Sequence, residues 1–239
     1  NIDIEEVRNQ ITSRTKLMII NSPNNPCGSI IGEKELEALS VLAKENDILV
    51  LSDEIYIRFL YEGTHESITK FPEMVDRTVI LDGFSKTYAM TGWRIGYGLL
   101  PDNLVEPISR LVTNSVSCTA SFTQKAALEA LTGPQDDSAK MVKEFKKRRD
   151  IVVTGLNNIS GIKCAIPKGA FYTFPNVEGT GLSSSNFANG LLEHAGVAVL
   201  SGESFGKFGA GYVRISFANS TENLEEALSR IENFLKAGS

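Results

Sequence analysis

The first part of the chain alternates short apolar runs with helical spacing. Apolar runs at 16–20, 48–51, 78–81 and 95–100 predict strands, and residues 33–46 carry apolar side chains at helical spacing. Strands that are apolar throughout are typical of a parallel sheet that is covered on both faces. Their alternation with helices therefore favours an α/β domain. A further helix is expected over residues 1–15, ahead of the first strand.

The pattern changes after Pro101, where helices are followed by short strands. The helices are expected at 101–115, 121–131, 135–156, 184–195 and 221–236. The strands are expected at 169–174 and 211–217. Within the long helix, the basic run at 143–149 is interpreted as a solvent-exposed face. This α+β pattern indicates a second domain, joined to the first by the long helix.

Composition excludes several classes of protein. The 239 residues include 42% hydrophobic and 22% charged side chains, which is ordinary for a globular protein, and the net charge of -5 gives no basic surface for nucleic acid. The sequence shows no signal peptide and no apolar run long enough to span a membrane. The three scattered cysteines form no metal-binding or disulfide pattern. We therefore expect a cytoplasmic protein that binds neither nucleic acid nor a membrane.

Polar residues follow the ends of the predicted strands. Asn25 follows the first strand, Asp53 and Tyr56 follow the second, and Lys86 follows the third. In an open parallel sheet, ligands bind beyond the carboxyl ends of the strands. Taken singly, Asp53 could be a helix N-cap and Tyr56 a core residue. His65 has no partner at metal or catalytic-triad spacing, so we predict no metal site and a structural or surface role for this side chain.

The segment at 83–96 carries the strongest chemical signal. Lys86 stands in a turn of small residues after an apolar strand, and Arg94 follows eight positions later. A lysine amine can form a Schiff base with an aldehyde, and an arginine can hold a phosphate through two hydrogen bonds. The segment closely resembles the cofactor-lysine signature of class I/II (fold-type I) aminotransferases, which use pyridoxal phosphate (PLP). Segments that match further landmarks of this family lie at 22–28, 52–56, 169–172 and 212–216.

The resemblance implies a role for each residue toward PLP. Lys86 would hold PLP as a Schiff base and move the proton, and Asp53 would keep the pyridine nitrogen protonated. Tyr56 and Asn25 would hydrogen-bond the phenolic oxygen of the ring. Arg94 would bind the phosphate. By this resemblance, Lys86, Asp53 and Tyr56 are the catalytic residues.

On the substrate side, the resemblance assigns Arg214 and Asn25. The guanidinium of Arg214 would hold the α-carboxylate of an amino acid, and a buried arginine on an apolar strand needs an anion in any case. The family often has a phosphate-binding serine three residues before the lysine, where this chain has Gly83. Ser85 is therefore the candidate hydroxyl for the phosphate.

The resemblance also implies fold, function and assembly. It implies part of the PLP-binding large domain at 1–133, an interdomain helix at 134–160 and a small domain at 161–239. The expected activity is transfer of an amino group between an amino acid and a 2-oxo acid by a homodimer. A PLP-dependent β-lyase and a non-catalytic effector-sensing domain are the alternatives. The upstream elements of the family site cannot be placed, so we expect a partial fold whose catalytic site is incomplete.

Overall fold

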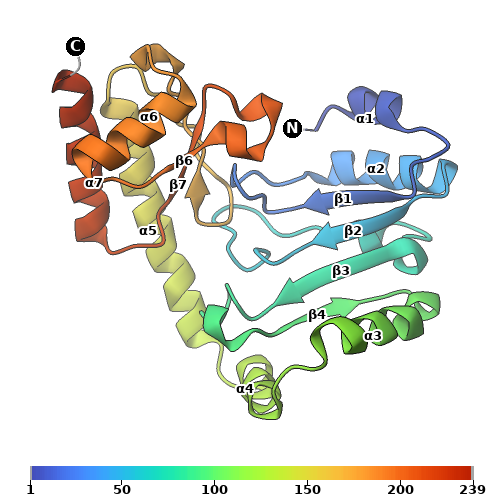
Figure 1. Ribbon diagram of the computed structural model, residues 1–239. Coiled ribbons are helices and arrows are strands. Elements are labelled where there is room, and N and C mark those ends of the chain that lie inside the picture. The colour runs from blue at the N-terminus through green and yellow to red at the C-terminus, as the bar shows by residue number, and fades with distance from the viewer. Residues whose placement is uncertain (1, 238–239) are drawn as a thin grey trace. The chain divides into compact units, whose positions relative to one another are not determined.

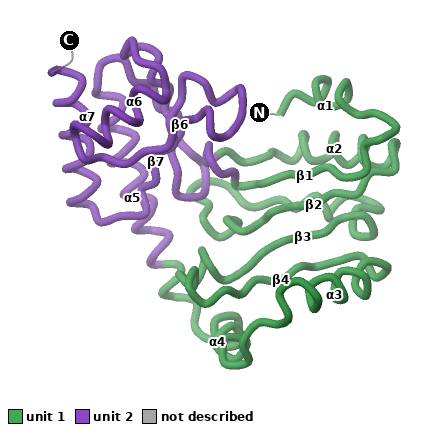
Figure 2. Tube along the Cα trace, viewed as in Figure 1, with its two compact units in different colours: residues 1–23, 29–139 green, residues 24–28, 140–239 purple. Residues whose placement is uncertain are grey.

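The computed structural model describes residues 2–237 (Figure 1). This part of the chain divides into two compact units, which we name unit 1 (residues 1–23 and 29–139) and unit 2 (residues 24–28 and 140–239) (Figure 2). The short segment 24–28 therefore belongs with the C-terminal half of the chain. The domain boundaries expected after residues 133 and 160 stay predictions.

Unit 1 contains a mixed sheet. Its strands are β1 (Leu17–Asn21), β2 (Leu49–Asp53), β3 (Thr78–Gly83) and β4 (Gly96–Leu99), paired in that order. β1, β2 and β3 run parallel, whereas β4 runs antiparallel to β3. The mostly parallel sheet confirms the predicted α/β class. The connection, residues 84–95, contains only a 3₁₀ turn, whereas a crossover between parallel strands usually contains an α-helix, which agrees with the antiparallel direction of β4.

Helix α2 (Glu33–Glu45) covers one face of this sheet. Its side chains Leu36, Leu39 and Ala43 form a buried cluster with Ile20 of β1 and Val50 of β2. This face carries the main apolar contacts of the first two strands, as the helical spacing of the sequence predicted.

Helix α1 (Ile4–Gln10) is shorter than the helix expected over residues 1–15. Asp3 caps its start by accepting hydrogen bonds from two backbone N–H groups. Beyond its end, the hydroxyl of Thr15 accepts from the backbone N–H of Thr12, and that of Thr12 accepts from Arg14. Hydroxyl groups that bond nearby backbone compete with helix formation, which explains the early end.

The remaining helices of unit 1 are α3 (Asp102–Val116) and α4 (Ser121–Thr132), with short 3₁₀ turns η1 (Ile68–Lys70), η2 (Val75–Arg77) and η3 (Thr91–Trp93). None of the residues of α3 is buried in the described structure, although its apolar residues gather on one side. In α4, Thr123 and Ala127 are buried.

Unit 2 has helices around a small antiparallel sheet. Its helices are α5 (Asp136–Asn158, which begins in unit 1), α6 (Ser184–Gly190), the π-helical turn η5 (Leu191–Ala195) and α7 (Thr221–Ala237). Its strands are β5 (Tyr172–Thr173), β6 (Leu200–Ser201) and β7 (Val213–Ser216), in the order β5–β7–β6. Its 3₁₀ turns are η4 (Glu178–Thr180), η6 (Gly202–Phe205) and η7 (Lys207–Gly209).

The strands of unit 2 are shorter than the runs expected at 169–174 and 211–217. Positive φ angles at Ala170 and Gly211 interrupt the extended backbone before β5 and β7 begin. In the core of the unit, Leu156, Phe187, Leu191 and Phe217 are almost completely buried.

The basic run of α5 is not solvent-exposed throughout, contrary to our interpretation. Arg149 is only 4% exposed. Its guanidinium pairs with Asp150 at 2.7 Å and donates to the carbonyl oxygen of Pro167 at 3.2 Å. These contacts explain how an arginine can be buried on this helix, since a buried charge needs partners.

Within residues 2–237, no helix combines the length and the apolar character needed to cross a bilayer. The same residues contain no group of three or more histidine, cysteine, aspartate or glutamate side chains that could bind a metal ion.

Candidate active site

The parallel strands of unit 1 end side by side, which places the predicted polar residues at one edge of the sheet. Asp53, the last residue of β2, is paired with Asn21 of β1 and Leu81 of β3. The side-chain amide of Asn21 donates to the backbone carbonyl oxygen of Asp53 at 3.0 Å. Lys86 follows β3 directly after this edge. Asp53 thus ends β2, and Lys86 follows the end of the neighbouring strand β3.

The carboxylate of Asp53 is half-buried. Its Oδ1 accepts a hydrogen bond from the backbone N–H of Ile55 at 3.2 Å. Burial raises the pKa of Asp53, and the nearby charge of Lys86 acts in the opposite direction. No α-helix follows Asp53 in this described segment, so the structure does not support the alternative role of helix N-cap.

Tyr56 lies in the turn that follows β2 and is only 4% exposed. Its ring packs edge-on against Phe59, with ring centroids 6.5 Å apart. Backbone hydrogen bonds from Ile57 to Glu54 and from Phe59 to Tyr56 close this turn. These hydrogen bonds therefore hold the backbone at Tyr56, three residues after Asp53, in a defined conformation.

Lys86 lies in a turn whose flanks are anchored in the core. Phe84 and Met90 are buried against Ala127 of α4, and the backbone N–H of both Tyr88 and Met90 donates to the carbonyl oxygen of Phe84. Lys86 itself is half-buried. The apolar anchors on both sides hold the lysine-bearing turn at the end of β3.

Gly83 has a steric reason to replace a serine. It pairs with Gly96 across β3 and β4, and a Cβ at Gly83 would come within 3.0 Å of the Cα of Gly96. A side chain therefore does not fit here without moving β4. Ser85, the other candidate hydroxyl, is half-buried in the lysine turn.

Arg94 ends the 3₁₀ turn η3 in a left-handed conformation, with φ of 53°. A positive φ is unusual for a residue with a side chain and often marks a functional position. Its guanidinium is exposed and donates to the carbonyl oxygen of Thr91 at 3.0 Å. Arg94 also lines an open pocket of about 800 Å³, together with Trp93, Cys118 and Phe122. The arginine thus faces a space large enough for an anion.

In unit 2, Arg214 and Asn25 meet. Nη1 of Arg214 on β7 donates to Oδ1 of Asn25 at 2.9 Å. The guanidinium lies over the rings of Tyr172 and Phe205, with 4.6 and 5.0 Å to the ring centroids. Both rings lie within the range of a favourable cation–π interaction with the guanidinium.

The segment that carries Asn25 is fixed by Gly28. This glycine has φ of 64°, and a Cβ there would lie 2.4 Å from Cβ of Pro167. The backbone N–H groups of Lys168 and Gly169 both donate to the carbonyl oxygen of Gly28. The close approach and these hydrogen bonds hold the 24–28 segment against residues 167–169 of the same unit.

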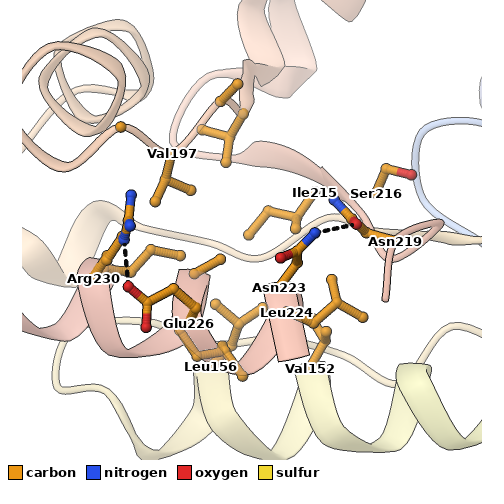
Figure 3. Close-up of a pocket in the computed structure, with 16 residues that line it drawn as sticks. Val152, Leu156, Val197, Ile215, Ser216, Asn219, Asn223, Leu224, Glu226 and Arg230 are labelled. Atoms are coloured by element: carbon orange, nitrogen blue, oxygen red, sulfur yellow. Dashed lines mark hydrogen bonds and ion pairs between the residues drawn. The ribbon is translucent and has the colours of Figure 1, made fainter. Parts of the chain in front are cut away.

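A separate cavity of about 340 Å³ lies in unit 2 between α5, α7 and β7 (Figure 3). Val152, Leu156 and Leu224 form part of its apolar wall. Two polar pairs lie among its lining residues: Arg230 donates to Glu226, and Asn223 to Asn219. Among the described residues that line it there is no predicted site residue.

The structure shows two polar pairs near the candidate site that the sequence did not reveal. The hydroxyl of Tyr97 donates to Asp82 at 2.6 Å. Burial, followed by the hydrogen bond to Asp82, raises the pKa of Tyr97 to about 12. The second pair joins His65 to the buried Glu54 at 2.8 Å. Asp82 and Tyr97 are direct partners on β3 and β4, but this register depends on the direction of β4, which the sequence did not predict.

The predicted site residues thus fall into two groups. Asp53, Tyr56, Ser85, Lys86 and Arg94 belong to unit 1, whereas Asn25 and Arg214 belong to unit 2. Each group has the geometry described above. That the two groups form one site remains a prediction.

Comparison with known proteins shows the family. The sequence profile of the family "Aminotransferase class I and II" matches residues 1–231. The chain is 42% identical over 238 residues to an aspartate aminotransferase of Pyrococcus abyssi, covering 98% of this chain and 61% of that protein. It is also 42% identical to an aromatic-amino-acid aminotransferase 2 of Thermococcus litoralis, again over 61% of that protein. The chain therefore spans about three-fifths of the length of these curated relatives.

Solved structures agree with this result. The crystal structure of an aromatic aminotransferase from Pyrococcus horikoshii is similar to this chain with a TM-score of 0.96 at 41% identity. The match covers 100% of this chain and 64% of that one. The predicted fold and the resemblance of the sequence motifs are confirmed. The chain belongs to the class I and II aminotransferase family.

Proposed function

We propose that this chain supplies the cofactor lysine and substrate arginine of a PLP-dependent aminotransferase, which moves an amino group between an amino acid and a 2-oxo acid. The observation that carries the proposal is that Asp53 ends β2 and Lys86 follows the end of the neighbouring strand β3, so both residues come at the same edge of the sheet. A lysine and a half-buried carboxylate at one edge of the sheet are the two groups that the family chemistry requires.

The residues present fit PLP. The half-buried carboxylate of Asp53, whose pKa burial raises, gains a favourable partner if a protonated ring nitrogen donates to it. Arg94 is exposed at a pocket of about 800 Å³, where a phosphate group can reach the guanidinium. Anion-binding and proton-accepting groups are thus both present in unit 1.

When bound, PLP supplies an aldehyde that condenses with amines and an aromatic ring that withdraws electrons. The Nζ amine of Lys86 would hold the cofactor and, when free, would serve as the base for the proton on the substrate Cα. Asp53 would keep the ring nitrogen protonated, which strengthens the electron withdrawal. Tyr56 would donate a hydrogen bond to the phenolic oxygen of the ring, and Ser85 would be a second donor to the phosphate.

Arg214 and Asn25 are the residues that would bind the substrate. The guanidinium of Arg214 contacts the rings of Tyr172 and Phe205 and donates to Asn25, so it is held in place before a ligand binds. A substrate carboxylate that binds this edge through two hydrogen bonds has its Cα placed in a defined position. Because relatives are named for aspartate and for aromatic amino acids, acidic and aromatic amino acids are the first substrates to test.

We further infer a cytoplasmic homodimer. Cys27, Cys118 and Cys164 form no disulfide in the described structure, which suits a reducing compartment. On unit 1, α3 and α4 expose large apolar side chains, including Leu111, Val116 and Phe122 at 67–72%. Exposed apolar patches of this kind support an interaction surface, and class I and II aminotransferases are generally dimeric.

An isotope-transfer assay tests the activity. The intact protein that contains this chain is incubated with PLP, ¹⁵N-labelled amino acids and unlabelled 2-oxo acids, and the products are analysed by mass spectrometry. We expect the label to appear in the new amino acid, and Lys86→Ala to abolish the transfer. Lys125→Ala, a change of another lysine in unit 1, is the matched control and should transfer normally. Transfer that persists in Lys86→Ala would contradict the proposal.

A further inference from the structure

Glu54 is a buried carboxylate directly beside Asp53. It is only 4% exposed. Its Oε1 accepts hydrogen bonds from the hydroxyl of Ser52 at 3.0 Å and from that of Ser67 at 2.9 Å. Its Oε2 lies 2.8 Å from Nε2 of His65. A carboxylate is rarely buried to this extent without partners, and here both oxygens are engaged.

The position of Glu54 on the chain gives these contacts a consequence for the candidate site. Glu54 is the residue directly after β2, and its side chain is buried whereas that of Asp53 is half-buried. The backbone N–H of Glu54 donates to the carbonyl oxygen of Leu81 at 2.8 Å, and its own carbonyl oxygen accepts from Ile57 at 3.0 Å. Glu54 therefore anchors the turn that presents Asp53 and Tyr56.

His65 and Ser67 connect this anchor to a second segment of unit 1. Both lie in the segment between the Tyr56 turn and η1. The hydroxyl of Ser67 also accepts from the backbone N–H of Thr69, which caps the start of η1. The Glu54 carboxylate thus ties the end of β2 to a segment 11 to 13 residues further along the chain.

The charge of Glu54 also acts on Asp53. The negative charge of Glu54 contributes to raising the pKa of Asp53, after the larger effect of burial. Burial alone would raise the pKa of Glu54, but the hydrogen bond and charge of His65 and the two serine hydroxyls lower it overall. The hydrogen bond from His65 therefore helps to keep Glu54 ionised, and it partly offsets the negative charge of Glu54 beside Asp53.

We propose that Glu54 and His65 act together as positioning residues for PLP: through their hydrogen bond they fix the Asp53–Tyr56 turn and balance the charge behind Asp53. This inference rests on the proposed function, since it assigns Asp53 and Tyr56 to the cofactor. It extends the site to two residues that do not touch the cofactor themselves.

A set of variants tests the pair. The variants are His65→Ala, His65→Gln, Glu54→Gln and the double variant Glu54→Gln/His65→Ala. The matched control is His194→Gln, because His194 is the other histidine of the chain and is exposed in unit 2. Affinity for PLP is measured from quenching of the fluorescence of Trp93, the one tryptophan of the sequence. The visible absorbance of bound PLP is followed against pH, and circular dichroism checks that each variant is folded.

For His65→Ala, we expect the dissociation constant of PLP to rise about tenfold or more, because a hydrogen bond to a buried charged group is lost. The pH at which the visible absorbance of bound PLP changes should move upward, since the Glu54 charge is then less balanced. His65→Gln, which keeps a hydrogen-bond donor, should recover part of the affinity. The double variant should be no weaker than the weaker single variant, because both changes remove one interaction. His194→Gln should behave as the unchanged protein.

Folded variants that bind PLP and titrate like the unchanged protein would overturn the positioning role while leaving the proposed function intact. Losses that add in the double variant would also overturn it, because the two residues would then act independently. If the unchanged protein itself forms no PLP adduct at Lys86, the proposed function fails, and this inference fails with it.

Discussion

At the level of single residues, Asp53 has a well-defined environment on the cofactor side. Its carboxylate is half-buried, accepts one backbone hydrogen bond and interacts with the charge of Lys86. The ring nitrogen of a cofactor is the group that such a carboxylate can keep protonated. This protonation matters most when negative charge develops during the reaction.

Asp53→Asn is therefore expected to reduce kcat strongly while PLP remains bound. An amide cannot stabilise the proton on the ring nitrogen, and loss of such a group costs about 10²- to 10⁴-fold in rate. Steady-state kinetics of the intact protein at saturating PLP give kcat, and quenching of the fluorescence of Trp93 gives the affinity for PLP. Near-normal turnover in a variant that retains PLP would contradict the role of Asp53.

Arg214→Lys is expected to raise KM for every amino acid tested, by about tenfold or more. Lysine keeps the positive charge but loses the planar guanidinium, which can bind a carboxylate through two hydrogen bonds and contacts the rings of Tyr172 and Phe205. All amino acids share the α-carboxylate, so the loss should be uniform. KM values for an acidic, an aromatic and an aliphatic amino acid check this. A loss limited to one class would make Arg214 a selector of side chains instead.

The lowered pKa of Glu54 predicts how the free energy of unfolding depends on pH. Its pKa is lowered in the folded protein from 4.5, so the ionised form contributes stability that is present above about pH 4.5 and is lost as pH falls through the lowered folded-state pKa. Glu54→Gln should therefore cost about 1–3 kcal/mol of unfolding free energy at pH 7 and less below pH 4.5. Urea unfolding of both proteins at several pH values measures this. A cost that stays constant with pH would exclude ionised Glu54 as its source.

At the level of elements, the conformation and packing of the segment at 24–28 depend on Gly28. Gly28→Ala combines a positive φ with a clash against Pro167, whereas Gly181 has a similar positive φ with open space around its Cβ position. Gly28→Ala should therefore destabilise the protein by about 1–3 kcal/mol more than Gly181→Ala. Urea unfolding of the two variants compares them. Equal losses would show that Pro167 moves aside easily.

The positions of most helices and strands could be predicted from the sequence. The apolar runs located β1, β2 and β3, and helical spacing located α2, because side-chain periodicity reflects burial directly. The direction of β4 was not encoded in its apolar pattern, since parallel and antiparallel strands can carry the same residues. The lengths of β5 and β7 were overestimated because positive φ angles at Ala170 and Gly211 depend on tertiary contacts.

In the candidate site, residues within local motifs could be predicted, whereas pairs that meet only in the folded chain could not. Asn25, Asp53, Lys86 and Arg214 could be proposed because each lies in a segment that resembles a family motif. The Glu54–His65 pair could not, because its members are 11 residues apart in sequence and meet through a loop. The burial of Arg149 was missed for a similar reason, since its partner Pro167 lies 18 residues away.

At the scale of the whole molecule, the apolar surface of α3 and α4 predicts association. We expect the isolated 239-residue chain to form a homodimer or a larger oligomer and to hold PLP weakly. Leu111→Glu and Phe122→Glu place charges on this exposed surface and should shift the chain toward monomer. Sedimentation velocity measures the assembly, with Phe208→Glu, an exposed apolar residue of unit 2, as control. A monomeric unchanged chain with tightly bound PLP would contradict the prediction.

The central claim is that Lys86 carries the cofactor. The protein is incubated with PLP, reduced with borohydride, digested and mapped by mass spectrometry. The account predicts a pyridoxyl group on the peptide that contains Lys86, and its loss in Lys86→Ala. Specific modification of a different lysine, with Lys86 unmodified, would contradict it.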